Sequence, residues 1–167
     1  MKLPQLLQDV RGCTACAAHL PHGVRPVLQV SQSARILIVG QAPGRKVHES
    51  GVPFDDASGE RLRAWMGIPA TTFYDASQIA ILPMGFCYPG TGKSGDLPPR
   101  PECAPLWHGP LLAALPGVRL TLLVGQYAQG AYLPKVLRSS MTEAVDPLTG
   151  AVSALASAVS GRRAATS

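Results

Sequence analysis

The amino-acid sequence predicts an α/β fold, in which helices cover both faces of a central parallel sheet. Short apolar runs of strand length alternate with stretches of helical periodicity along the first 133 residues, which is the pattern of such sheets. Two of these runs end in glycine, at Gly40 and Gly125. Because ligands bind beyond the carboxyl ends of parallel strands, the loops after these glycines are the first candidates for a functional site. With 167 residues and a hydrophobic content of 46%, the chain is large enough to bury one core.

The predicted elements follow one another in a regular order. A short amphipathic helix is expected at the N-terminus, where apolar side chains recur at helical spacing: Leu3, Leu6, Leu7 and Val10. Residues 35–40, Arg-Ile-Leu-Ile-Val-Gly, predict a buried parallel strand. After a loop, one apolar face predicts a helix: Leu62, Trp65 and Met66. Strands are then predicted at 79–82 and 120–125, with a helix over about 106–115 between them.

Two segments depart from this rhythm. Residues 88–105 are rich in proline and glycine and have almost no apolar periodicity, so we expect something other than core packing, such as a metal site, to hold this loop. From about Lys135 onward the sequence is rich in alanine, serine and valine. We therefore divide the chain into an α/β domain at 1–133 and an atypical low-complexity tail at 134–167, expected to be poorly ordered or weakly helical.

The net charge of +5 favours a polyanionic partner such as nucleic acid. The N-terminus lacks the continuous apolar core of a signal peptide, and the longest apolar runs elsewhere are interrupted by glycine, proline or Arg119. We therefore expect a cytoplasmic protein with no membrane contact. In a reducing cytoplasm, its four cysteines are better suited to metal binding, catalysis or burial as free thiols than to disulfides.

The spacing of the cysteines narrows these options. Cys13 and Cys16 form a Cys-x-x-Cys pair, and seventy residues further on come Cys87 and Cys103, with fifteen residues between them. Four thiolates on distant loops are typical ligands of an iron–sulfur cluster. A structural zinc ion also uses Cys-x-x-Cys, although zinc ribbons usually supply two closely spaced pairs. From spacing alone, an iron–sulfur cluster, a zinc site and inert or redox-active thiols all remain open.

Five motifs follow one another in a fixed order: Cys-x-x-Cys, then a strand with Gly40-Gln-Ala-Pro-Gly44, then Gly51-Val-Pro-Phe54, then Cys87 and finally Pro-Glu-Cys103. This order resembles that of the iron–sulfur uracil-DNA glycosylases of bacteria and archaea, over about residues 1–133. The resemblance implies a three-layer α/β/α fold with a central parallel sheet of about four strands. It also implies a [4Fe-4S] cluster on four cysteines: Cys13, Cys16, Cys87 and Cys103.

A base pocket is implied as well, because a glycosylase takes its base out of the duplex and holds it against an aromatic side chain. Phe54 stands at the position of the family's stacking residue. Gly40, Gln41 and Ala42 form the turn after the first strand, where backbone N–H groups are expected to bind a uracil carbonyl. Gln41 and Ala42 occupy the catalytic positions. Gln41 stands where many relatives carry Glu and cannot take up a proton, so we expect it to position a water molecule or the base.

Several polar residues flank this pocket in the sequence. His48 lies between the turn and Phe54 and is a candidate pocket residue, with a surface histidine as the alternative. We expect Asp55 and Asp56 to cap a helix rather than to act on the substrate. Four cations in loops are candidate phosphate contacts, with plain solvation as the alternative: Arg45, Lys46, Lys93 and Arg100.

Two departures from the family bear on activity. Relatives place an asparagine before the third cluster cysteine to recognise the uracil edge, and here Pro83 takes that position. The family's late His-Pro-Ser motif, whose histidine stabilises the leaving base, has no counterpart after His108, the last histidine. Because one such donor is worth about 3 to 4 kcal/mol, we expect slow or no turnover. We interpret the tail as a truncated or frame-shifted substitute for the family's last strand and helix, which puts the fourth strand in doubt.

The predicted function is therefore a monomeric base-excision repair glycosylase, which flips uracil or a related damaged base out of DNA and hydrolyses its N-glycosidic bond. Two alternatives stay open. One is a degenerate relative that keeps the cluster and the DNA contacts without turnover. The other is a zinc-stabilised α/β domain whose Gly40–Gly44 loop binds a nucleotide phosphate.

Overall fold

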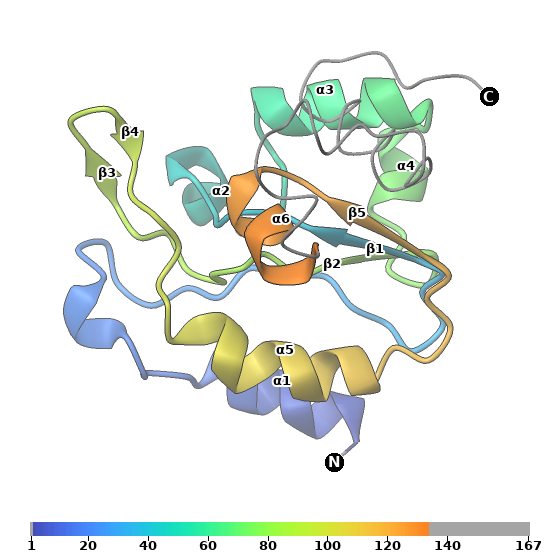
Figure 1. Ribbon diagram of the computed structural model, residues 1–167, viewed down its shortest axis with the longest axis horizontal. Helices are drawn as coiled ribbons and strands as arrows, with labels where there is room; N and C mark the ends of the chain where they lie inside the picture. The colour runs from blue at the N-terminus through green and yellow to red at the C-terminus, as the bar shows by residue number, and fades with distance from the viewer. Residues whose placement is uncertain (1, 134–167) are drawn as a thin grey trace.

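The computed structural model describes residues 2–133 of the chain. Its centre is a parallel sheet of three strands, which lie in the spatial order β2 (Ile79–Ile81), β1 (Ile36–Val39) and β5 (Leu120–Leu123) (Figure 1). In the middle strand, Ile36 is level with Ile79 on one side and with Leu120 on the other. All three strands agree with the sequence prediction. Within residues 2–133 no fourth strand pairs with them.

Successive residues of each strand face opposite sides of the sheet and so enter two different cores. On one face, Leu37 and Val39 pack with three helices: α1 (Leu3–Arg11), α5 (Cys103–Ala113) and α6 (Gln126–Tyr132). On the other face, Ile38 packs with α3 (Ala57–Met66) and α4 (Ala70–Phe73). Figure 1 shows α1 and α5 side by side beneath the sheet and α3 and α4 above it. The chain therefore has the predicted three-layer α/β/α architecture.

Local sequence explains where two of the predicted helices begin and end. α1 carries a proline in its first turn, where a missing N–H is tolerated, and it buries Leu3, Leu6 and Val10. The side chain of Asp56 caps the start of α3, and Gly67, with a φ of 69°, follows its last residue. The predicted apolar face of α3 is only partly correct. Trp65 is 39% exposed, and the guanidinium of Arg61 lies over its ring, with 5.9 Å between Cζ and the centroid.

Four helices differ from the prediction, since α4 and α6 were not predicted and two others differ in kind or extent. The expected loop after β1 contains a short helix, α2 (Arg45–Ser50), which ends at Gly51 with a φ of 73°. α5 begins at Cys103 rather than near residue 106, because Pro105 falls in its first turn, where proline is compatible with a helix. Cys103 is therefore the first residue of a helix and not a loop residue.

The proline- and glycine-rich segment at 88–105 is held partly by packing, which the sequence did not predict. It forms a small antiparallel hairpin of β3 (Thr91–Gly92) and β4 (Gly95–Asp96). The side chain of Tyr88 is completely buried, and its ring stacks on His22 with 5.1 Å between centroids. The ring of His48 lies 5.7 Å away from it on another side. One large aromatic residue thus anchors a loop that otherwise lacks apolar periodicity.

The two outer edges of the sheet differ. Gln29 closes the edge at β2 through paired backbone hydrogen bonds with Ile81, and its amide nitrogen also donates to the carbonyls of Phe73 and Ile79. No strand lies beside the outer edge of β5 within residues 2–133. The predicted tail at 134–167 lies outside the described residues. Among the described helices, none combines the length and the apolar character needed to span a bilayer.

Candidate active site and cysteine cavity

A pocket opens at the carboxyl ends of the parallel strands, where this class of fold predicts it. Its walls are the turn after β1, the segment before α3, and the residues that follow β2 and β5. The empty space, including the part open to solvent, is about 640 Å³. The structure brings together at this pocket the five residues that the sequence assigns to base binding and catalysis: Gly40, Gln41, Ala42, Phe54 and Pro83.

The turn after β1 is fixed by the chain that follows β2. The N–H of Met84 donates to the carbonyl of Gly40 at 2.8 Å, and the N–H of Gly85 donates to the carbonyl of Gln41 at 3.0 Å. The ring of Phe54 lies against this turn, because a Cβ atom added at Gly40 would be only 3.1 Å from the Cζ atom of Phe54. Glycine at this position is therefore what allows the aromatic ring to approach the turn.

Phe54 adopts a strained backbone conformation. Its φ of 57° makes it the one residue other than glycine with a positive φ in the described part of the chain. Such a conformation costs on the order of 1 to 3 kcal/mol and persists only where the surroundings impose it. The half-buried ring meets Phe73 edge-on, with 6.0 Å between centroids. A strained aromatic residue in the wall of an open pocket is typical of a functional position.

The carboxylate of Asp56 also borders the pocket, but it is engaged. Its Oδ1 atom accepts hydrogen bonds from the Ser58 hydroxyl at 2.7 Å and from the N–H of Gly59 at 2.9 Å. The predicted helix cap is therefore confirmed for Asp56. Asp55 is exposed and does not line the pocket.

Pro83 lines the pocket beside β2 and is supported by a buried histidine. The Nε2 atom of His108 lies 2.8 Å from the Pro83 carbonyl oxygen, which can only accept, so Nε2 carries the proton. The Nδ1 atom then accepts from the hydroxyl of Tyr132 at 2.5 Å. Burial lowers the pKa of His108, which keeps the ring neutral at pH 7. Sequence reasoning treated His108 only as the last histidine and missed this supporting role.

His48 does not line the pocket. It lies on α2, and the neighbouring Val47 contributes to the pocket wall instead. Its ring belongs to an aromatic cluster with His22 and Tyr88, at centroid distances of 6.2 and 5.7 Å. Its Nδ1 atom is buried and has no hydrogen-bond partner among the described residues.

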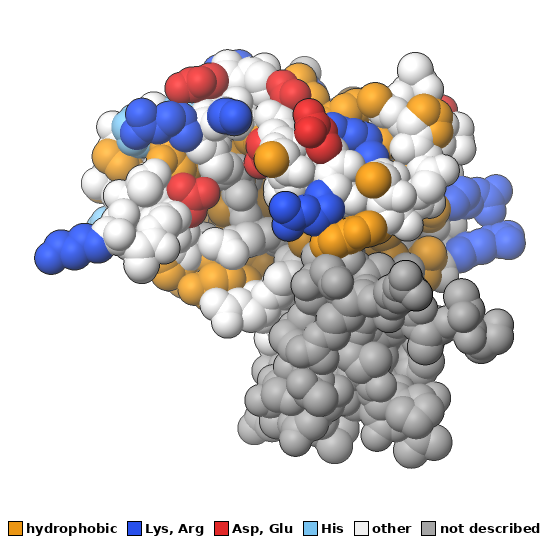
Figure 2. Space-filling model, turned by 90° about the horizontal axis from the view of Figure 1, so that it is seen from above, with side chains coloured by type: hydrophobic (Ala, Val, Ile, Leu, Met, Phe, Trp, Pro, Cys, Tyr) orange, Lys and Arg blue, Asp and Glu red, His pale blue; other side chains and the backbone are white. Residues whose placement is uncertain are grey.

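The four predicted phosphate contacts occupy different environments. Arg45 and Lys46 are exposed in the first turn of α2 and not in a loop as predicted, and Lys93 is exposed in the turn between β3 and β4. Arg100 instead forms an ion pair with Glu102, with 2.5 Å between Nη2 and Oε1. Figure 2 shows that on one face of the molecule the Lys and Arg side chains are separated by acidic and uncharged ones. On that face the cations are therefore dispersed rather than gathered in one continuous patch.

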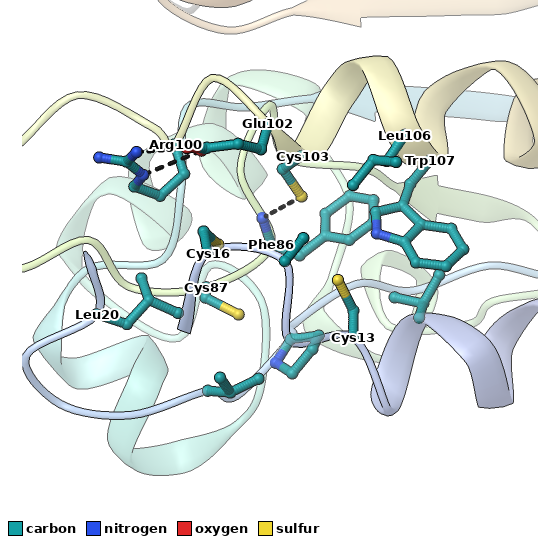
Figure 3. A pocket seen from close by; sticks show the side chains of 14 residues that line it. Cys13, Cys16, Leu20, Phe86, Cys87, Arg100, Glu102, Cys103, Leu106 and Trp107 are labelled. Carbon is teal, nitrogen blue, oxygen red and sulfur yellow. Dashed lines mark hydrogen bonds and ion pairs between the residues drawn. The ribbon is translucent and has the colours of Figure 1, made fainter. Parts of the chain in front are cut away.

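All four cysteines line a second cavity (Figure 3). Cys13 follows α1, Cys16 precedes the short helix η1 (Ala17–His19), Cys87 precedes the hairpin and Cys103 begins α5. The rest of the wall is mainly apolar and includes Phe86, Leu106 and Trp107, with the Arg100–Glu102 pair at its border. The fold thus brings two sequence-distant pairs of thiols to one place, as their order in the sequence predicts.

Burial controls the protonation of these thiols. It raises the pKa of Cys103 to about 12 and that of Cys87 to about 11, and it also raises the pKa of Cys16. The Sγ atom of Cys103 accepts a hydrogen bond from the N–H of Phe86 at 3.4 Å. In the absence of a metal these buried thiols are therefore protonated at neutral pH, and a metal centre would have to displace their protons.

The four thiols and their surroundings fit a metal centre with sulfur ligands. Four sulfur ligands, an apolar wall and an N–H donor to sulfur are the surroundings that iron–sulfur clusters use. A single zinc ion needs its thiolates within about 4 Å of one another, since each Zn–S bond is about 2.3 Å. Within residues 2–133, no three Cys, His, Asp or Glu side chains converge on a point where one ion would be held.

The structure also reveals contacts around the pocket that sequence reasoning did not find. Arg63, Tyr74 and Gly59 all contact the backbone of Pro53 or Phe54. Each of these residues lies on or near a helix, and helical periodicity alone explains its presence in the sequence, so none of them indicated a functional role. The one available signal was the glycine inside the first turn of α3, where glycine lowers helix propensity and therefore calls for a packing reason.

A comparison with protein families agrees with this geometry. The model of a family described as the uracil DNA glycosylase superfamily matches residues 28–161. The matched range contains the three strands, the pocket-lining residues other than Val27 and two of the four cysteines, and it extends into the part of the chain beyond residue 133.

Proposed function

Because the chain belongs to the uracil DNA glycosylase superfamily, we propose that it removes uracil, or a related damaged base, from DNA. The base would leave the stack and enter the pocket beside β1, where water would hydrolyse its N-glycosidic bond. The observation that carries this proposal is the position of the Phe54 ring against Gly40 in an open pocket at the strand ends. An aromatic ring held there offers a stacking surface to a planar base.

The chemistry requires the pocket to stabilise positive charge on the sugar and negative charge on the departing base. Gln41 offers an amide that donates and accepts hydrogen bonds but does not take up a proton, so its proposed role is to orient the attacking water or the base. The backbone N–H groups of the turn at 40–42 are the proposed partners of a base carbonyl. The carboxylate of Asp56 is occupied as a helix cap and is left out of the mechanism.

A second candidate function is binding without turnover, and the wall at Pro83 favours it. This residue has no side-chain amide, and its carbonyl oxygen already accepts a hydrogen bond from His108. Of the residues 2–133, those that line the pocket include no histidine to stabilise the leaving base. A donor of that kind is worth about 10²- to 10³-fold in rate, so slow turnover is expected.

DNA is the proposed partner, and the exposed cations are its proposed phosphate contacts. Arg45 and Lys46 begin the helix that follows the pocket turn, so they flank the point at which a flipped nucleotide would enter. Lys93 stands further away, at the tip of the hairpin. Because Arg100 is paired with Glu102, we assign it to the border of the cysteine cavity rather than to a phosphate.

For the cysteine cavity we propose a [4Fe-4S] cluster on Cys13, Cys16, Cys87 and Cys103, with zinc as the alternative. The apolar wall and the N–H donor to Cys103 support the cluster. When bound, a cluster would act as a cross-link between segments far apart in the sequence. Those segments would be the end of α1, the entry to the hairpin and the start of α5.

The glycosylase proposal is tested with an oligonucleotide that contains one uracil, followed by alkaline cleavage at abasic sites. We expect nicking above an enzyme-free control, strongly reduced by Phe54→Ala. It should be retained in Trp65→Ala, which removes an exposed aromatic ring away from the pocket. Binding that weakens with salt but gives no nicking would favour the second candidate. A protein that shows neither binding nor nicking would overturn both candidate functions.

The cluster proposal is tested separately by metal analysis of the purified chain. We expect iron and acid-labile sulfide at about four each per chain. One zinc ion per chain and no iron would contradict the cluster and support the zinc site instead.

A further inference from the structure

The backbone of Pro53 and Phe54, including the strained conformation of Phe54, is contacted by three residues. The first contact is with Gly59 in α3. A Cβ atom added to Gly59 would lie 1.7 Å from the carbonyl oxygen of Phe54, so helix and carbonyl are in direct backbone contact. The Asp56 cap in turn fixes the N–H of Gly59. The carbonyl of Phe54 is therefore held against the start of the helix.

The second and third contacts come from Arg63 and Tyr74. The Nη1 atom of Arg63 donates to the carbonyl of Phe54 at 3.1 Å and to the hydroxyl of Tyr74 at 3.1 Å. The Tyr74 hydroxyl uses its own proton to donate to the carbonyl of Pro53 at 2.8 Å, because a carbonyl only accepts. Two consecutive carbonyls are thus bound by one continuous chain of hydrogen bonds.

The guanidinium itself has little freedom to move. Its Cζ atom lies 5.2 Å from the centroid of the Phe73 ring and 5.4 Å from that of Tyr74. Phe73 is completely buried, and its ring also meets the ring of Phe54 edge-on. The same aromatic side chain therefore supports the cation that holds the Phe54 backbone and the Phe54 ring itself.

On its remaining side, the ring of Phe54 meets the turn at Gly40, where there is no room for a Cβ atom without displacing the ring or the turn. The position of the ring is therefore set between the turn after β1 and the Arg63–Tyr74 pair. We propose that Arg63 and Tyr74 are positioning residues that fix Pro53 and Phe54 and thereby set how a flipped base stacks; this inference rests on the proposed function.

Two variants test the inference, each with a matched control. Tyr74→Phe removes one hydroxyl, and Tyr127→Phe makes the same change on α6, away from the base pocket. Arg63→Met removes the guanidinium but keeps much of the stem, and Arg61→Met does so at an exposed position of the same helix. If Arg63→Met does not fold, Arg63→Lys takes its place, because lysine keeps the charge but has no planar guanidinium to lie over the rings of Phe73 and Tyr74.

The first readout is the position of the ring and does not depend on activity. Nuclear Overhauser contacts between the Phe54 ring protons and the Gly40 α-protons should be present in the wild type and both controls, and weakened or lost in Tyr74→Phe and Arg63→Met. The second readout is uracil release. kcat should fall about 10- to 100-fold, the usual effect of a misplacement of about 1 Å. KM should change little, because phosphate contacts dominate DNA affinity.

The outcomes separate the two proposals. Ring contacts that persist unchanged in both variants overturn the inference, and so does an unchanged kcat when the contacts are lost. A wild-type protein that neither cleaves nor binds the oligonucleotide overturns the proposed function. In that case the ring contacts still decide whether Arg63 and Tyr74 hold Phe54 in place.

Discussion

His108 donates a hydrogen bond from Nε2 to the carbonyl oxygen of Pro83, and through it a buried imidazole supports one wall of the base pocket. The ring lies between Phe86 and Tyr132, at centroid distances of 5.8 and 5.9 Å, and is nearly parallel to both. In the neutral form, which burial favours, the proton on Nε2 and the lone pair on Nδ1 satisfy both of its polar contacts. The pocket has four wall segments, and three of them directly follow strands of the sheet. The support that His108 gives to Pro83 comes instead from α5, across the core.

Stability should therefore fall in mild acid. Burial lowers the pKa of His108 in the folded state below the value of about 6.5 expected in the unfolded chain. The unfolded state then binds more protons below that value, so the contribution of His108 is complete above about pH 6.5 and is lost as the pH falls toward the folded-state pKa. Urea unfolding at pH 5 and pH 7.5 measures the loss. His108→Gln, which keeps an N–H donor but does not titrate, should show a smaller difference, and an equal difference would contradict this assignment.

The support of Pro83 can also be tested at neutral pH. His108→Leu fills most of the space but leaves the Pro83 carbonyl without its donor, so we expect a loss of about 1 to 3 kcal/mol in the free energy of unfolding. His108→Gln should lose less. The measurement is chemical denaturation at pH 7.5, and a His108→Leu protein as stable as the wild type would argue that the hydrogen bond contributes nothing.

Pro83→Asn should improve uracil recognition. The variant keeps the backbone carbonyl that binds His108. Its new side-chain amide lies at the wall formed by Pro83, which has no amide in the wild type. One added hydrogen bond to a base is worth about 1 kcal/mol, so uracil release should rise about five- to tenfold. The control is Pro116→Asn, an exposed position outside the pocket. Equal rates for the variant and the wild type would show that the amide does not reach the base.

Gly59→Ala and Gly109→Ala should change stability in opposite directions. Both glycines lie in helices, where alanine is favoured by about 1 kcal/mol. Nothing lies within 4 Å of a Cβ atom at Gly109, whereas one at Gly59 would collide with the backbone of Phe54. We expect Gly109→Ala to be slightly more stable and Gly59→Ala to be less stable by about 2 kcal/mol or more. Denaturant midpoints decide this, and a stabilising Gly59→Ala would show that the contact with Phe54 relaxes freely.

Replacement of a cavity cysteine should remove the metal centre. Cys103→Ser is expected to lose bound iron and to lower the melting temperature, because the buried wall of the cavity then loses its cross-link. Thr14→Ala, at an exposed position between Cys13 and Cys16, is the control and should keep both. Unchanged iron content in Cys103→Ser would exclude this residue as a ligand.

The sequence predicts the parts of this fold that depend on periodicity and on motif order. The strands around Ile38 and Leu122 are recognisable because they are short, apolar and bounded by glycine or polar residues, and α1 is recognisable from its apolar spacing. The meeting of Phe54 with the turn after β1 followed from the order of motifs. For the strands and α1 the information lies within a few residues of the chain, whereas the site follows from the resemblance that the order of motifs indicates.

Other features depend on contacts that no local pattern records. The exposure of Trp65 depends on how α3 sits on the sheet, and the helix after Gly44 is too short to show a clear periodicity. The Arg63–Tyr74 pair and the bond from His108 to Pro83 join residues 11 and 25 positions apart. Such hydrogen bonds follow from tertiary packing, so an arginine on an amphipathic helix and a histidine in an apolar one looked unremarkable before the fold was known.

The pairing of Gln29 with Ile81 affects at which edge a further strand can be added to the sheet. At the β2 edge, the place of a further strand is taken by a segment that is not itself a strand. Among the described residues, only the edge at β5 is left open to another strand. Val124 and Gly125, which continue β5, are also part of the pocket wall. Any strand that docks on that border, from this chain or from another molecule, would therefore adjoin the entrance through which a base arrives.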